Sequence, residues 1–372
     1  MTTTTTGTSG ATRPTGGLEG VVAADTRLSH VDGDRGELII AGHRVEALAG
    51  VRTFEETLAL LRTGAVPDGA SAAAIAGALG EARARAFAAL DPRDPALRYA
   101  DGMDALRALV ARVTVAPGRD ATLDLVAAVA VAAAAWQRAR AGAALVPPDA
   151  SAGHAADVLR MATGVVPTDA ATRALERYLV TVSDHGMNAS TFAARVVAST
   201  GSDEVSAVVA AIGALKGPLH GGAPGPVLDM LDAVRSPDRA REYLTGELDA
   251  GRRIMGMGHR IYRVRDPRAA VLEAGIEQLE RAGVATGKLA LARAVEREAA
   301  ALLAARHPDR ALRANVEFYT AVILDAVGIA RAAFTPTFAV GRVAGWCAHV
   351  QEQRQTGRLI RPASRYVGPM PG

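Results

Sequence analysis

The apolar part of this chain consists mainly of small aliphatic residues, and this constrains its fold more than any other feature. Apolar residues make up 49% of the 372 positions, whereas aromatic residues make up only 4%. Small side chains fill a core well where helices pack closely, and the abundant Ala and Leu favour helix. The sequence therefore predicts an all-α or nearly all-α protein, long enough for one large core or two unequal ones.

Proline and glycine clusters divide the chain into a succession of segments. Residues 31–45 carry a Gly-rich turn and a short Ile and Leu run, which predicts one small β-hairpin near the N-terminus. Helices are predicted after it over Thr53 to Arg62, Ser71 to Leu90, Asp104 to Val113, Asp120 to Ala141, Ala155 to Thr163, Asp169 to Ser183, Asn188 to Ser199 and Asp203 to Lys216. Shorter, charged helices are expected next, then a long apolar helix from Val316 and a last helix over Phe338 to Gln351.

The densest break in the helical pattern is GPLHGGAPGP at residues 217–226. Its prolines oppose a helix and its glycines permit unusual backbone angles, so we expect a hinge or a substrate loop. At the other extreme, the Thr- and Gly-rich residues 1–17 have no apolar segment of the kind an export signal needs, and they are expected to form a disordered tail.

Several features favour a cytoplasmic protein without a membrane span. Cys347 is the only cysteine, which rules out an intrachain disulfide. The most apolar run, Val126 to Trp136, is shorter than the ~20 residues that a span needs. It is expected to be a buried Ala-rich helix.

Arginine accounts for nearly all of the basic charge. Lys216 and Lys288 are the only lysines among 42 basic residues, which leaves 42 − 2 = 40 arginines. These arginines alternate with acidic residues along the predicted helices instead of forming one basic block. This pattern is typical of solvated helix faces and argues against nucleic-acid binding.

Three histidines lie in similar settings, each in a predicted loop at a helix end beside small residues. They are His185 in SDHGMNAST, His220 in GPLHGG and His259 in MGMGHR. Each one alone is explained as well by a structural role, but their shared context favours a common site. No two of them have metal-ligand spacing, so no metal is expected.

Two further segments suggest recognition of anions and proton transfer. RIYRVRDPRA after His259 gathers arginines beside Asp266 and Pro267, an N-cap and first residue of a helix, and guanidinium groups suit phosphates and carboxylates. In NVEFY, Glu317 enters the first turn of an apolar helix. A solvated arginine face and favourable interaction with the helix dipole are the structural alternatives.

Taken together, these segments resemble the citrate synthases, which carry HxxNAST, GPLHGG, GxGHRxYxxxDPR and NVDFY motifs in this order. The N-terminal hairpin and TFEETLALLRTGAVP resemble the beginning of the same family, so the likeness covers nearly the whole chain. It implies a two-domain helical fold. A large, dimer-forming domain would comprise residues 18–221 plus 326–372, and a small, mobile, CoA-binding domain residues 222–325.

The resemblance also implies a reaction: condensation of acetyl-CoA with oxaloacetate to citrate, the entry step of the tricarboxylic acid cycle. His220 would hydrogen-bond the thioester oxygen, Glu317 would remove a methyl proton, and His259 would donate to the oxaloacetate carbonyl. Both partners of the first step are needed, because a carboxylate is too weak a base for a thioester C–H unless the developing oxygen charge is stabilised.

Substrate and CoA residues follow from the same motifs. The oxaloacetate carboxylates would be held by His185, Arg268, Arg342 and Arg361. Arg361 would reach the site of the partner subunit, which implies a homodimer. CoA, a cosubstrate and not a tightly bound cofactor, would contact Met255, Gly256, Met257, Gly258 and Arg263.

Two alternatives remain open, one of them because of a departure from the family. Glu317 stands where most members have Asp, and a shift of ~1 Å at a reacting group can cost about 10²-fold in rate. A catalytically silent relative that binds oxaloacetate or CoA is therefore one alternative. A 2-methylcitrate synthase that uses propionyl-CoA is the other, and no motif in the sequence separates it from a citrate synthase.

Overall fold

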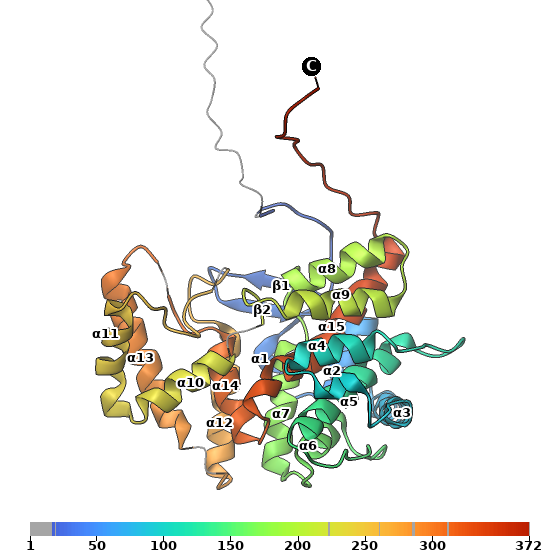
Figure 1. The fold of residues 1–372 in the computed structure, drawn as a ribbon, viewed down its shortest axis with the longest axis horizontal. Coiled ribbons are helices and arrows are strands. Elements are labelled where there is room, and N and C mark those ends of the chain that lie inside the picture. The colour runs from blue at the N-terminus through green and yellow to red at the C-terminus, as the bar shows by residue number, and fades with distance from the viewer. Residues whose placement is uncertain are drawn as a thin grey trace, which may run out of the picture.

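The computed structural model describes residues 17–18, 20–221, 224–259, 261–284, 287–310 and 312–371. The predicted tail, residues 1–17, lies outside these ranges except for Gly17. The described chain is helical apart from one small sheet (Figure 1), which confirms the predicted fold class. Within the described ranges, no helix combines the length and the apolar character needed to cross a bilayer.

The sheet contains the predicted hairpin and one short additional strand. β1 (Ser29–Asp32), β2 (Glu37–Ile40) and β3 (His43–Arg44) are antiparallel and adjacent in this order, with Ser29 opposite Ile40. Gly36 and Gly42, at φ 66° and 86°, make the two turns. These left-handed angles strain any residue that carries a Cβ.

The helices predicted before the Gly-Pro break agree with the structure to within a few residues. They are α2 (Phe54–Thr63), α3 (Gly69–Ala88), α4 (Gly102–Val110), α5 (Ala121–Arg140), α6 (His154–Thr163), α7 (Asp169–Val182), α8 (Ala189–Ser199) and α9 (Glu204–Leu215). Two short helices, α1 (Val45–Leu48) and η1 (Pro95–Arg98), were not predicted. Side-chain caps fix most of their N-termini; Thr53, for example, forms a capping box with Glu56.

The second half of the chain differs more from the prediction. It comprises α10 (Pro224–Val234), η2 (Pro237–Arg239), α11 (Ala240–Asp249), α12 (Pro267–Arg281), α13 (Lys288–Arg306), α14 (Val316–Ala326), η3 (Arg331–Ala333) and α15 (Phe334–Thr356). The prolines of the break do not exclude a helix: α10 starts at Pro224, because a first turn needs no N–H donor from proline. Gly222 and Ala223 of the break lie outside the described residues.

Two predicted helix lengths were wrong, for different reasons. α14 has 11 residues and stops before Gly328, whose φ of 86° turns the chain. α15 has 23 residues and begins at Phe334, before the predicted Phe338, because Pro336 occupies its first turn. The predicted shorter helices also include α13, which has 19 residues.

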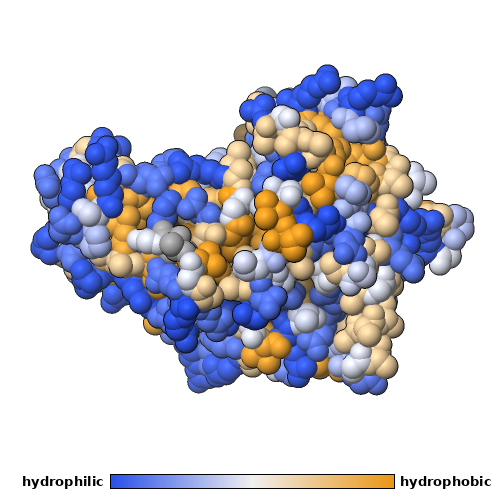
Figure 2. All heavy atoms as spheres, turned by 90° about the horizontal axis from the view of Figure 1, so that it is seen from below, coloured by the Kyte–Doolittle hydropathy of each residue, from blue (hydrophilic) through white to orange (hydrophobic). Residues whose placement is uncertain are grey.

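α15 forms the centre of the large core. It packs against α5, α7, α8 and α9, and its side chains from Phe334 to Val350 are buried almost without interruption. α5 is buried as predicted, and the indole of Trp136 donates to the Tyr99 carbonyl at 3.0 Å. α10 to α14 lie together on the other side of the molecule (Figure 1). Viewed from below, the rim is largely hydrophilic and apolar residues gather in patches nearer the centre (Figure 2).

A half-buried acidic residue, Glu176 on α7, is expected to make stability depend on pH. Burial and the neighbouring Glu55 raise its pKa from 4.5 to about 8. Between pH 4.5 and 8, Glu176 is therefore ionised in the unfolded chain but still protonated in the folded chain. The free energy of unfolding consequently falls as the pH rises through this range. Gln can still accept the hydrogen bond from the Phe54 N–H.

Glu176→Gln is accordingly expected to raise the unfolding free energy by about 2 kcal/mol at pH 9 and to change it little at pH 4. Urea titrations at the two pH values measure this. A gain of equal size at both would show that ionisation of Glu176 is not the cause.

Candidate active site

Arg268 and Asp266 anchor the site at the N-terminus of α12. Asp266 caps this helix, as predicted, and accepts two hydrogen bonds from the Arg268 guanidinium, at 3.0 and 2.7 Å. Its Oδ2 also accepts from the Val316 N–H at 3.1 Å, which ties α12 to the start of α14. Both side chains are buried. The arginine is thus held rigidly at the junction of two helices.

His259 lies in the loop before α12 and faces Arg268. Its Nδ1 accepts from the Ile261 and Tyr262 N–H groups, at 3.0 and 3.2 Å. The ring proton therefore belongs on Nε2, because burial lowers the pKa of His259 to about 4 and keeps it neutral. Arg268 Nη2 is 3.4 Å from this Nε2. Since both atoms carry hydrogens, they are two donors that converge on one position suited to an oxygen.

His185 comes to the same place from the loop after α7. Its ring lies 5.6 Å from that of His259, and its Nε2 is 3.1 Å from the Tyr262 hydroxyl. Burial, with the charge of Arg268, holds the pKa of His185 well below its usual value. The structure therefore brings His185, His259 and Arg268 together, although they come from two distant loops and a helix start.

His220 is held at the N-terminus of α8. Its Nε2 accepts from the Ser190 N–H at 3.3 Å and lies 2.8 Å from the Ser190 hydroxyl, which accepts in turn from the Trp346 indole. Burial lowers the pKa of His220 to about 4, so the ring is neutral. With Nε2 used as an acceptor, the proton lies on Nδ1, which makes His220 a donor there.

Glu317 is the carboxylate of the site. It occupies the first turn of α14, capped by Asn315, and is 8% exposed. Its Oε2 has no hydrogen-bond partner among the described residues. Burial raises its pKa to about 7, against the lowering influence of Arg268 and Arg342. A carboxylate with this pKa and a free oxygen is suited to act as a general base near neutral pH.

Arg342 completes the cluster from the middle of α15. It is buried, its Nε donates to the Val182 carbonyl at 2.5 Å, and its guanidinium stacks over Phe338. Burial lowers its pKa to about 10, so it remains a cation. Arg268 and Arg342 together influence the pKa values of Glu317, His185 and His220. Those three side chains therefore lie in the field of one pair of arginines.

A basic cavity of about 780 Å³ opens beside His259. Its cationic residues are Arg263, Arg265, Arg310 and Arg313. Arg265 is neutralised by Glu273 and Glu296, whereas Arg263 is exposed at the mouth. The volume and charge suit a phosphorylated ligand.

The predicted CoA-contact loop, residues 255–258, directly precedes His259, which lines this cavity. It is pinned to the chain before α14 by hydrogen bonds from Gly258 N to Arg313 O and from Asn315 N to Gly256 O, at 2.7 and 2.9 Å. Gly256 has φ 72°, and a Cβ there would approach Phe318 and Val227 within 3.0 Å. Backbone angle and packing thus explain this glycine without any ligand.

Arg361 is the one predicted site residue that lies apart. It is exposed on the extended chain after α15, where it lines a separate cavity with Leu18 and Arg195. Both described ends of the chain run away from the body on this side (Figure 1). The sequence did not single out two polar partners within the site, Tyr262 and Ser190, because tyrosine is common in cores and serine at helix starts.

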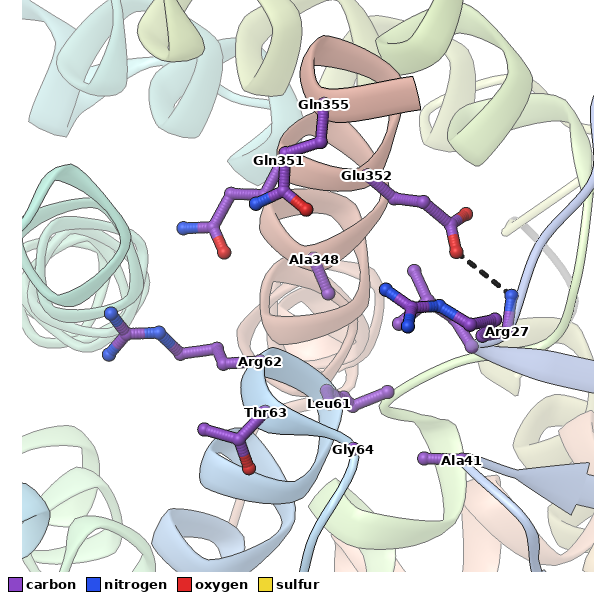
Figure 3. Close-up of a pocket in the computed structure, with 11 residues that line it drawn as sticks. Arg27, Ala41, Leu61, Arg62, Thr63, Gly64, Ala348, Gln351, Glu352 and Gln355 are labelled. Carbon is purple, nitrogen blue, oxygen red and sulfur yellow. Dashed lines mark hydrogen bonds between the residues drawn. The ribbon is translucent and has the colours of Figure 1, made fainter. Parts of the chain in front are cut away.

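A further cavity, of about 310 Å³, lies between α2 and α15 (Figure 3). Its Glu352 accepts from the Arg27 N–H and pairs with the buried Arg195. Arg195 donates to His349, which in turn hydrogen-bonds Asp184, the neighbour of His185 in the chain. This cavity is therefore the outer end of a buried polar chain behind the site, and it contains none of the candidate catalytic residues.

Fold and site together define a class: a helical enzyme whose site brings neutral histidines and two buried arginines together with one carboxylate of raised pKa. The family described as "Citrate synthase, C-terminal domain" matches residues 17–363. Citrate synthase from Haloferax volcanii is 39% identical over 367 residues, covering 95% of both chains.

Solved structures of citrate synthases also resemble this chain over nearly its whole length. Citrate synthase from Thermotoga maritima superposes with a TM-score of 0.82 at 32% identity, covering 97% of both chains. The ternary complex of the Thermoplasma acidophilum citrate synthase with carboxymethyl coenzyme A and oxaloacetate gives a TM-score of 0.82 at 27% identity, covering 95% of this chain and 96% of that one. The chain belongs to the citrate synthase family.

Proposed function

We propose that the protein condenses acetyl-CoA with oxaloacetate and hydrolyses the product thioester to citrate and CoA. The observation that carries this proposal is the convergence of His185, His220, His259 and Glu317 on Arg268 and Arg342. The site needs neither a metal nor a tightly bound cofactor for this chemistry. Acetyl-CoA and oxaloacetate enter as substrates.

Each candidate residue has a step that its protonation state permits. Glu317 Oε2 takes a proton from the acetyl methyl group while the Nδ1–H of His220 stabilises the thioester oxygen by a hydrogen bond, which gives an enolate. The enolate carbon attacks the ketone carbon of oxaloacetate and forms the C–C bond. The ketone oxygen takes the proton from Nε2 of His259, and the proton that Glu317 removed replaces it. Water then cleaves the C–S bond of the citryl thioester and releases CoA.

Substrate binding follows from charge. Arg268, Arg342 and His185 hold the oxaloacetate carboxylates. The cavity with Arg263 at its mouth and the loop of residues 255–258 hold CoA. Movement of the small domain, residues 222–325, against the large domain, residues 18–221 plus 326–372, closes the site over both substrates. We place the enzyme in the cytoplasm, because its one cysteine, Cys347, is buried and unpaired.

Release of free CoA in the presence of oxaloacetate tests the proposal with acetyl-CoA and propionyl-CoA in parallel. Acetyl-CoA should give the higher kcat/KM. One methylene in an apolar pocket is worth about 1–3 kcal/mol, or roughly 10- to 200-fold. A comparable excess for propionyl-CoA would indicate a 2-methylcitrate synthase, and no CoA release with either substrate would indicate a silent relative.

The pH dependence of kcat/KM should report Glu317. The base must be ionised, so activity should fall tenfold per pH unit below an apparent pKa near 7. His220 and His259, with pKa values of about 4, stay neutral across this range and add no second limb. A flat profile from pH 6 to 8 would contradict this assignment of the base.

A homodimer would supply Arg361 to each site. α9 has an apolar stripe that is only half covered: Val205, Val209, Ala210, Gly213 and Ala214 lie on one face of the helix. α8 covers one side of α9 (Figure 1), which leaves this stripe of small residues open to a close helix contact.

Mixing two inactive variants tests whether Arg361 acts across the dimer. In a heterodimer of Glu317→Gln and Arg361→Ala subunits, the second subunit keeps its own Glu317 and receives Arg361 from the first. Random assortment of equal amounts should restore about a quarter of wild-type activity. If Arg361 served its own subunit, every site in the mixture would lack one residue, and no activity would return.

A further inference from the structure

Tyr262 lies between the side chains that we assign to oxaloacetate, and none of the steps above uses it. It is 1% exposed. Its hydroxyl is 3.1 Å from His185 Nε2, its ring is centred 4.7 Å from that of His259, and the Arg268 guanidinium carbon lies 5.9 Å from the ring centre. One side chain thus contacts His185 from a distant loop and two residues, His259 and Arg268, from its own stretch of chain.

The N-terminal hairpin holds the segment that carries Tyr262. The Arg263 N–H donates to the Gly33 carbonyl at 2.8 Å, and a Cβ on Gly33 would lie 2.3 Å from the Ile261 carbonyl oxygen. The neighbours of Tyr262 on both sides are therefore packed against the β1–β2 turn.

The same hairpin also holds the loop of His185. The Ser29 hydroxyl accepts from the Gly186 N–H at 2.7 Å and donates to Asp184. The hairpin consequently fixes the spacing between the loops of His185 and His259, and the contact between Tyr262 and His185 joins these loops inside the site.

We infer that Tyr262 is a positioning residue of the oxaloacetate pocket, which fixes the ring of His185 through its hydroxyl and supports His259 and Arg268 through its ring. His185 is a buried neutral imidazole, so a ring nitrogen without a partner would cost free energy and the ring would turn to recover one. Tyr262 remains a phenol because burial raises its pKa. The inference rests on the proposed function, which makes this pocket the oxaloacetate site.

Calorimetric titration of oxaloacetate into the full-length protein tests this role without requiring turnover. Tyr262→Phe removes only the hydroxyl and should weaken oxaloacetate binding about 5- to 10-fold, the value of one neutral hydrogen bond. Tyr262→Leu also removes the ring support and should weaken it further. The KM for acetyl-CoA at saturating oxaloacetate should change less than about twofold in Tyr262→Phe.

A double-mutant cycle separates positioning from a general loss of structure. If Tyr262 acts through His185, adding Tyr262→Phe to His185→Ala should weaken oxaloacetate binding no further. Fully additive losses, or wild-type affinity in Tyr262→Phe, would overturn the inference. Tyr99→Phe, whose ring is 43% exposed at the end of η1, is the matched control and should bind oxaloacetate like the wild type.

The hairpin contact provides a second test. Gly33→Ala should displace the Ile261 carbonyl and reproduce the weaker oxaloacetate binding, whereas Gly77→Ala on α3, where a Cβ meets nothing within 4 Å, should not. Wild-type affinity in Gly33→Ala would contradict the hairpin's role. A wild-type protein that binds oxaloacetate but releases no CoA would refute the proposed function alone, and one that binds no oxaloacetate would overturn both.

Discussion

Replacing Glu317 with Gln is expected to lower kcat by about 10³-fold, the middle of the range for removal of a general base. Gln keeps the size and a polar end group but cannot take a proton from the acetyl methyl group. Because Oε2 of Glu317 has no partner among the described residues, the substitution leaves no protein group unpaired. Oxaloacetate binding, which depends on Arg268 and Arg342, should remain within about threefold of wild type.

Glu317→Asp tests whether this site has adapted to the longer side chain. Asp restores the base but withdraws it by one methylene, so kcat should recover only in part, to about 10²-fold below wild type. Equal rates for Asp and Glu would show that the reacting atoms are not positioned by this helix. If Glu317→Gln kept wild-type turnover, the base would have to be another residue, and the proposed mechanism would fail.

The helices before the Gly-Pro break could be predicted from the sequence because their signals are local. Asp120 and Asp203 each stand where a polar cap meets an apolar periodic run, and each caps a helix through its side chain. The errors arose where a residue has two readings. The prolines of residues 217–226 were expected to oppose a helix, yet Pro224 begins α10, where proline is tolerated, and Pro336 likewise lies in the first turn of α15.

The candidate site was predictable as a set of residue types but not as a set of contacts. Histidines in Gly-rich loops and arginines at a helix start drew attention to the right segments. The partners that set their protonation are distant in sequence: Tyr262 is 77 residues from His185, and Ser190 is 30 from His220. A tyrosine and a serine are common in cores and caps, so only tertiary packing distinguishes these two.

Replacing His220 with Ala should lower kcat by about 10²- to 10³-fold, the usual cost of losing one donor to a developing oxyanion. The structure also predicts which ring nitrogen donates, because Nε2 of His220 accepts from the Ser190 N–H and only Nδ1 can donate. The amide nitrogen of Asn lies near the position of Nδ1, and that of Gln near the position of Nε2. His220→Asn should therefore retain more activity than His220→Gln.

Exchange of the acetyl-CoA methyl protons with deuterated solvent, followed by mass spectrometry in the presence of a non-reacting oxaloacetate analogue, isolates the step in which His220 acts. Exchange should slow as much as kcat in His220→Ala, because the same oxygen charge develops when Glu317 removes the proton. If His220→Ala exchanged the methyl protons at the wild-type rate but turned over more slowly, His220 would act in the later step that forms the C–C bond. Higher activity in His220→Gln than in His220→Asn would show that Nε2, not Nδ1, donates to the thioester oxygen. The tautomer inferred from the contact with Ser190 would then be wrong.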